Sequence, residues 1–230
     1  MKLLYVGRLL FTWTLFFSAV TSSFAEPVAA PFVGNDFSGI PCHGNPRGHG
    51  PFDYLQRSRY QHDLILVEGS HFTSSVERLI KGNRSGDSPL GDINYTLRAF
   101  PNHHRALYSA IQLRINPNLY SFTDMKTFVP AECWLQRGLR FSPEDPIAHM
   151  LYGLLLHKMG KLQEAENYYN KSLSLMPNNA QTIYNLGLLM FDLKKYDSAN
   201  QHAQFVYSNN YPLEGLKNKL ISVGKWRPAD

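Results

Sequence analysis

The residues of this chain that are best suited to chemistry lie in its first third. Four of the nine histidines share one segment with one of the two cysteines: Cys42, His43, His49, His62 and His71. Neutral imidazole and thiolate are ligands that zinc and copper prefer. Glu68 and Glu77 lie near His71, although an ordinary helical surface would place them there as well. One interpretation of residues 42–77 is therefore the site of a metal-dependent or hydrolytic cell-envelope enzyme.

The spacing of these residues argues against that interpretation. It matches neither a paired Cys-x-x-Cys nor a His-Glu-x-x-His pattern. The sequence also has no nucleophile elbow and no glycine-rich phosphate loop. We therefore predict no catalytic residue, no metal site and no cofactor, and we expect most histidines on surfaces and turns. His103 and His104 follow Pro101-Asn102 at an expected helix start, where capping and packing are their expected roles.

The segment 1–25 has the pattern of a secretory signal peptide. Lys2 and Arg8 are basic, Leu9–Val20 is almost wholly apolar, and Ser23-Phe24-Ala25 places small residues before a cut at Glu26. No later apolar run is long enough for a membrane span. We expect the mature chain to begin at residue 26, to have no membrane span and to be periplasmic or secreted.

The charge of the chain does not favour nucleic acid as a partner. The formal net charge is +5, and removal of Lys2 and Arg8 with the leader reduces it to +3. No block rich in lysine and arginine occurs anywhere in the sequence. A nucleic-acid-binding domain is expected to carry such a block.

The two cysteines, Cys42 and Cys133, allow two arrangements. In an oxidising compartment they could pair and tie the N-terminal part to the rest of the chain. A bridge over so long a loop would stabilise the fold by roughly 4 kcal/mol. The alternative is a buried thiol at Cys133 and a separate exposed thiol at Cys42. The sequence leaves both open.

The second half of the chain repeats itself at the interval that separates Pro143 from Pro177. Matched residue types recur at that interval: Pro143 and Pro177, Gly153 and Gly187, Leu154 and Leu188, Ala165 and Ala199. Small residues at fixed positions allow two helices to approach closely, and large apolar residues between them fill the space. One helical hairpin cannot bury its apolar face alone, so such units stack. The period predicts stacked pairs of antiparallel helices.

These residues resemble the tetratricopeptide repeat family. Residues 146–179 match its pattern at Tyr152, Gly153, Ala165, Tyr169 and Pro177, and residues 180–213 match it at Leu186, Gly187, Ala199 and, one place later, Pro212. An imperfect earlier unit spans residues 101–143, with an insertion of about eight residues around Asn116-Pro117-Asn118. The segments LGDINYTLRAFPNHHRAL and YPLEGLKNKL are similar to exported bacterial proteins of unassigned function.

The resemblance implies an all-α superhelix of about three helical hairpins, with an irregular N-terminal segment. The expected order is a signal peptide (1–25), a Pro/Gly-rich lead-in (26–51), a helical capping segment (52–100), the repeats (101–213, with clean units at 146–179 and 180–213) and a cap helix with a tail (214–230). A polar cap is expected because a repeat array must end on a solvated face.

The resemblance also implies a concave groove that is lined by the first helix of each unit and binds a protein or peptide partner. The groove positions carried over to this chain are Ile147, Met150, Leu154, His157, Lys158, Gln181, Tyr184, Asn185, Leu188, Phe191 and Asp192. The alternative is that some of them contact the cap helix or the N-terminal segment. We therefore predict an exported adaptor or scaffold. The sequence predicts neither the partner's identity nor the oligomeric state.

Overall fold

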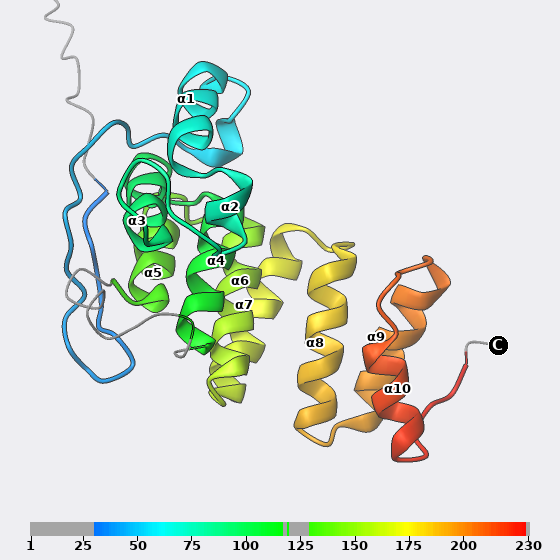
Figure 1. Cartoon of the computed structure of the whole chain (residues 1–230). Helices are drawn as coiled ribbons and strands as arrows, with labels where there is room; N and C mark the ends of the chain where they lie inside the picture. The colour runs from blue at the N-terminus through cyan, green and yellow to red at the C-terminus, as the bar shows by residue number, and fades with distance from the viewer. Residues whose placement is uncertain (1–29, 117–118, 120–128, 229–230) are drawn as a thin grey trace, which may run out of the picture.

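The computed structural model of the chain describes residues 30–116, 119 and 129–228, and that part is all-α (Figure 1). It contains a 3-10 helix, η1 (Tyr54–Gln56), and ten α-helices: α1 (Gln61–His71), α2 (Ser74–Glu77), α3 (Pro89–Ala99), α4 (His104–Ile115), α5 (Ala131–Phe141), α6 (Pro146–Lys158), α7 (Leu162–Leu175), α8 (Ala180–Asp192), α9 (Tyr196–Ser208) and α10 (Gly215–Ser222). The prediction of an all-α repeat fold is confirmed. The predicted signal peptide lies outside the described residues. Within them, no helix combines the length and apolar character that a membrane crossing requires.

The predicted period appears as two hairpins in the same register. Helices α6 and α7 recur one period later as α8 and α9, since α6 begins at Pro146 and α8 at Ala180. The turn inside each hairpin also recurs, because Gly160 and Lys194 both have a left-handed backbone, with φ of 76° and 60°. Glycine adopts this conformation freely, whereas a residue with a Cβ atom loses roughly 1 kcal/mol there. The turn of the second hairpin therefore keeps the left-handed backbone conformation, although this conformation is less favourable for Lys194 than for a glycine.

The repeated glycines are positions of close helix contact, as the period predicts. A Cβ atom on Gly153 would lie 2.8 Å from the ring of Tyr169 in α7, and one on Gly187 would lie 2.5 Å from Leu216 in α10. Ala165 and Ala199 are fully buried. The small residues thus allow each first helix to approach its neighbours at the distance that the stack requires.

A junction around the carboxylate of Asp145 joins the first two hairpins to the N-terminal segment. Asp145 is fully buried and caps α6 by accepting hydrogen bonds from the backbone N–H groups of residues 147 and 148. It also accepts hydrogen bonds from Nε2 of His104 at 2.8 Å and from Nδ2 of Asn102 at 2.8 Å. Asn102 in turn donates to Asp53 and accepts from the backbone N–H of Tyr54, next to η1. We call these residues, Asp53, Asn102, His104 and Asp145, the Asp145 junction.

His103 caps α4, which confirms the capping role expected for it. Its Nδ1 accepts a hydrogen bond from the backbone N–H of Ala106, and its Nε2 lies 2.9 Å from a carboxylate oxygen of Glu68 in α1. Both bonds fit a neutral ring that is protonated on Nε2 only. Burial lowers the pKa of His103 and so favours the same neutral form, although Glu68 opposes this shift.

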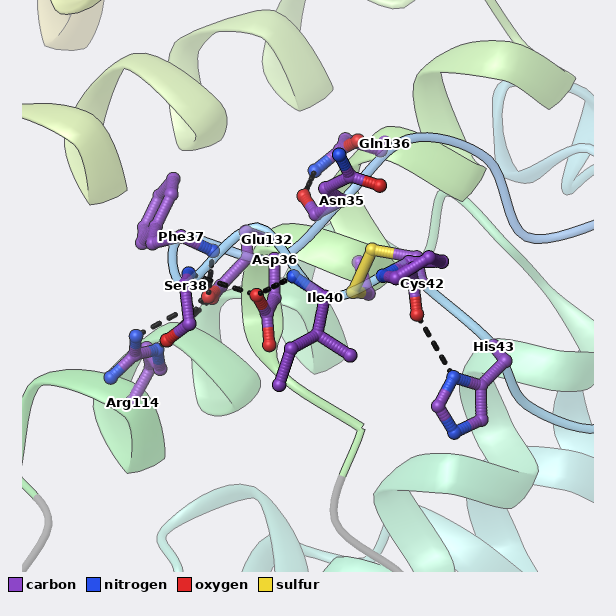
Figure 2. The surroundings of a disulfide bond; sticks show 12 residues. Asn35, Asp36, Phe37, Ser38, Ile40, Cys42, His43, Arg114, Glu132 and Gln136 are labelled. Carbon is purple, nitrogen blue, oxygen red and sulfur yellow. Dashed lines mark hydrogen bonds and ion pairs between the residues drawn. A yellow bond between two sulfur atoms is a disulfide. The ribbon is translucent and has the colours of Figure 1, made fainter.

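The lead-in lies alongside α3 and α5 (Figure 1). Cys42 and Cys133 form a disulfide with their Cα atoms 5.4 Å apart. Close by, the backbone N–H of Phe37 donates to the buried carboxylate of Glu132, which also binds Arg114 (Figure 2). Further along α5, the guanidinium of Arg137 donates to backbone carbonyl groups of residues 30, 46 and 97. The disulfide and these polar bonds to α5 therefore hold the lead-in in place.

Replacing Asp145 with alanine should lower the free energy of unfolding by about 3 kcal/mol, because His104, Asn102 and two backbone amides lose their buried acceptor. Urea unfolding monitored by circular dichroism measures this change. The matched control is Glu144→Ala, since Glu144 is exposed and its ion pair with Lys171 is long, at 3.6 Å. The control should cost less than about 0.5 kcal/mol. Equal losses in the two variants would contradict the structural role of the junction.

Reduction of the disulfide should destabilise the fold by about 4 kcal/mol, because the bridge joins cysteines with a sequence separation of 91. Urea unfolding with and without dithiothreitol measures this difference. The double variant Cys42→Ala/Cys133→Ala serves as the control and should not respond to dithiothreitol. A wild-type protein that unfolds at the same urea concentration in both conditions would show that the bridge contributes no stability.

Candidate functional site

A groove runs across the first helices of the three hairpins. Its volume is about 390 Å³. Its walls come from α4, α6, α7, α8 and the connection to α10: Tyr108, Met150, Leu151, Leu154, His157, Lys158, Tyr169, Gln181, Tyr184, Asn185, Leu188 and Leu213. Eight of the eleven residues predicted from the sequence are among them. None of the lining residues belongs to the lead-in, which packs against α3 and α5.

Three predicted groove residues lie outside these walls. Ile147 is half-buried and packs against the core. Phe191 lies edge-on to Tyr196, and the Nζ atom of Lys219 in α10 is 4.9 Å from the centre of its ring. Asp192 accepts hydrogen bonds from His157 and Lys219. For Phe191 and Asp192, the structure therefore shows the alternative arrangement, in which a repeat residue contacts the cap helix.

Most of the residues that line the groove are apolar or aromatic, and Asn185 adds a buried amide among them. Tyr184 and Met150 are buried in the floor, whereas Tyr108 and Leu213 on the rim are 47% and 51% exposed. Asn185 donates from Nδ2 to the thioether sulfur of Met150 at 3.3 Å. Sulfur is a weak acceptor, so a peptide carbonyl oxygen would be a better partner for this amide.

Comparison with protein families agrees with this geometry. Residues 146–179, which form α6, α7 and the start of the next turn, match the tetratricopeptide repeat model. Residues 146–179 therefore form a tetratricopeptide repeat. No curated protein sequence matches it. Repeats of this family generally mediate interactions between proteins and are typically parts of non-enzymatic scaffolds.

The tetratricopeptide register also explains a groove residue that the sequence analysis missed. Tyr108 occupies the same place in α4 as Met150 in α6 and Tyr184 in α8. The spacing from Tyr108 to Met150 is longer than the regular spacing from Met150 to Tyr184. Counting back by one repeat length from Met150 therefore does not identify Tyr108. The start of α4 at His104 would have identified this residue. By contrast, no sequence signal places Leu213 in the groove, because it precedes α10 in an irregular segment.

Three of the four histidines of residues 42–77 have separate polar partners. Nδ1 of His43 lies 2.9 Å from the carbonyl oxygen of Pro41, while His49 pairs with Asp63 and His71 with Asp92. Cys42 is in the disulfide and therefore offers no thiolate. Across residues 30–116, 119 and 129–228, no three His, Cys, Asp or Glu side chains come together as a metal site.

One ionisable pair borders the groove. Nε2 of His157 lies 2.9 Å from a carboxylate oxygen of Asp192, and the imidazole is largely buried. Burial lowers the pKa of His157, although the Asp192 carboxylate opposes this shift. Burial alone would raise the pKa of Asp192, but its hydrogen bonds from His157 and Lys219 lower it. At neutral pH the groove edge therefore holds a neutral imidazole next to an ionised carboxylate.

The pKa of His157 should be below the ordinary value of about 6.5, as measured by NMR titration of the imidazole. The unfolded chain then binds more protons than the folded chain near pH 6. The contribution of this group to stability is therefore full above pH 6.5 and declines as the pH falls.

Two variants with opposite expected effects test the cause of this shift. Asp192→Asn should lower the pKa of His157 further, because the carboxylate favours the imidazolium. Lys158→Gln should raise it, because the ammonium of Lys158 repels the imidazolium. A wild-type pKa above 6.5, or two variants that shift it in the same direction, would contradict this account.

Proposed function

We propose that this protein is an exported adaptor that binds an apolar segment of a partner protein in the groove of α4, α6 and α8. The observation that supports this most directly is the groove itself. Equivalent positions of three successive hairpins supply Tyr108, Met150 and Tyr184, and Leu154 and Leu188 lie beside them. A row of aromatic and flexible apolar groups provides several adjacent sites for the side chains of a bound peptide.

The state of the groove in the isolated chain also supports binding. The lead-in is fixed to α5 by the disulfide and by Glu132, and it supplies no residue to the groove walls. Leu154 and Leu188 remain half-buried, and Tyr108 and Leu213 are exposed on the rim. A partner would therefore remove apolar surface from water without displacing the described part of the lead-in. Burial of this kind is the main favourable term in protein association.

Two features support export. Residues 1–25 have the charged, apolar and small-residue pattern of a signal peptide. The Cys42–Cys133 bridge is of the kind that persists in oxidising compartments such as the periplasm or the extracellular medium. Mass spectrometry of the protein secreted by its host would test this proposal. The expected N-terminal residue is Glu26, and a mature protein that retains residues 1–25 would contradict it.

Replacing Tyr108 and Leu188 with alanine should weaken partner binding at least about tenfold for the double variant, because each change removes apolar contact area from the groove. The partner segment is first located by crosslinking in the native host and mapping of the crosslinked residues. A synthetic peptide of that segment is then titrated against each variant by calorimetry.

The matched control is Phe205→Ala. Phe205 is an aromatic residue of α9 that is 39% exposed and does not line the groove. The control should bind like the wild-type protein. Circular dichroism should show all variants folded. Unchanged affinity in a folded Tyr108→Ala/Leu188→Ala variant, or an equal loss in Phe205→Ala, would exclude the groove as the binding site.

A further inference from the structure

A second pocket lies away from the groove, between the lead-in and α3. Its volume is about 470 Å³. The lining residues are Asn45, Arg47, Gly48, His49, Tyr95 and Arg98. Two of them are arginines, and none is acidic. A pocket with this composition attracts negative charge.

Arg98 of α3 has unused hydrogen-bonding capacity in this pocket. Its Nε atom is buried and has no hydrogen-bond partner within the described part of the chain. Its guanidinium lies over the ring of Tyr95, with Cζ 5.5 Å from the ring centre. A buried N–H group without an acceptor is unfavourable, and a guanidinium fork matches the oxygen atoms of an oxyanion. Arg98 therefore lines the pocket with a guanidinium charge that no carboxylate of the described residues balances.

A third guanidinium increases the positive charge behind the pocket. Arg137 of α5 is fully buried, and the acceptors that it binds are carbonyl oxygens of the backbone. Burial and the nearby charge of Arg98 lower the pKa of Arg137 to about 10, so it still carries its charge at neutral pH. Buried charges in proteins are normally paired with an opposite charge.

Two arginines of α4 show the kind of partner that this pocket lacks. Arg105 binds the carboxylates of Glu68 and Glu77, and Arg114 binds that of Glu132. Among the described residues, Arg47, Arg98 and Arg137 have no such ion pair. An acidic group at the pocket's edge is Asp63, and it pairs with His49 at 2.9 Å. An anion between the arginines would supply the absent counter-charge.

We propose that this pocket binds the oxyanion of a small phosphorylated or sulfated molecule, held between the guanidinium groups of Arg47 and Arg98. Charge-assisted bonds from two guanidinium groups suit a doubly charged tetrahedral anion. The pocket is larger than one such ion requires, so the remainder of a small molecule fits against Tyr95 and Asn45. This site is separate from the peptide groove, and neither proposal depends on the other.

Inorganic phosphate is the probe for this site. Calorimetry of the purified protein with sodium phosphate, at an ionic strength held constant with sodium chloride, should show saturable binding. Arg98→Gln and Arg47→Gln should each raise the dissociation constant at least about tenfold, because each removes a charged donor. Arg47 is exposed on the lead-in, so its replacement tests the site even if Arg98→Gln fails to fold.

Arg59→Gln is the matched control. Arg59 lies over the ring of Tyr60, outside the pocket, so this variant should bind phosphate like the wild-type protein. Absence of saturable binding, an equal loss in Arg59→Gln, or an unchanged affinity in the folded Arg47→Gln and Arg98→Gln variants would overturn the proposal. Sedimentation of the protein with vesicles of anionic phospholipid, without binding of free phosphate, would also overturn it in favour of a membrane surface.

Discussion

The contact between the first hairpin and the second is organised around a buried carboxylate, that of Asp145. Removing such a group from water costs several kcal/mol unless its oxygen atoms are fully hydrogen-bonded. Here the acceptor positions are filled from three parts of the chain: the first turn of α6, the start of α4 and, through Asn102, the segment around η1. The direction of α4 relative to α6 is thereby fixed. This direction places Tyr108 in line with Met150 and so determines the shape of the groove.

The N-terminal segment is held on one side of the stack, and this leaves the groove open. The disulfide and the bonds to Glu132 and Arg137 fix the lead-in against α5. The same path carries residues 45–49 past α3, where they meet Arg98. The attachment of the lead-in to α5 therefore accounts for both the open groove and the arginine pocket. The described residues of the lead-in stay outside the groove, and the arginine pocket is formed from segments that are distant in sequence.

The repeat period predicted the features that depend only on equal spacing along the chain. It placed α6 to α9 and brought Met150, Leu154, Tyr184 and Leu188 to one surface, because equal spacing gives equal orientation. It did not identify Tyr108, because the hairpin of α4 and α5 is longer than the other two. Nor could it show that Phe191 and Asp192 contact Lys219, that Asp145 binds Asn102, or that Cys42 lies near Cys133. These features depend on how segments meet in space, and a Pro/Gly-rich lead-in gives no periodic signal of its path.

The shared register of the two clean hairpins has a consequence for protein engineering. Asp145 and Asn179 cap α6 and α8 at equivalent positions, and the intervening turns have the same backbone geometry at Gly160 and Lys194. We therefore expect that a second copy of residues 146–179, inserted after Asn179, would lengthen the array by one hairpin.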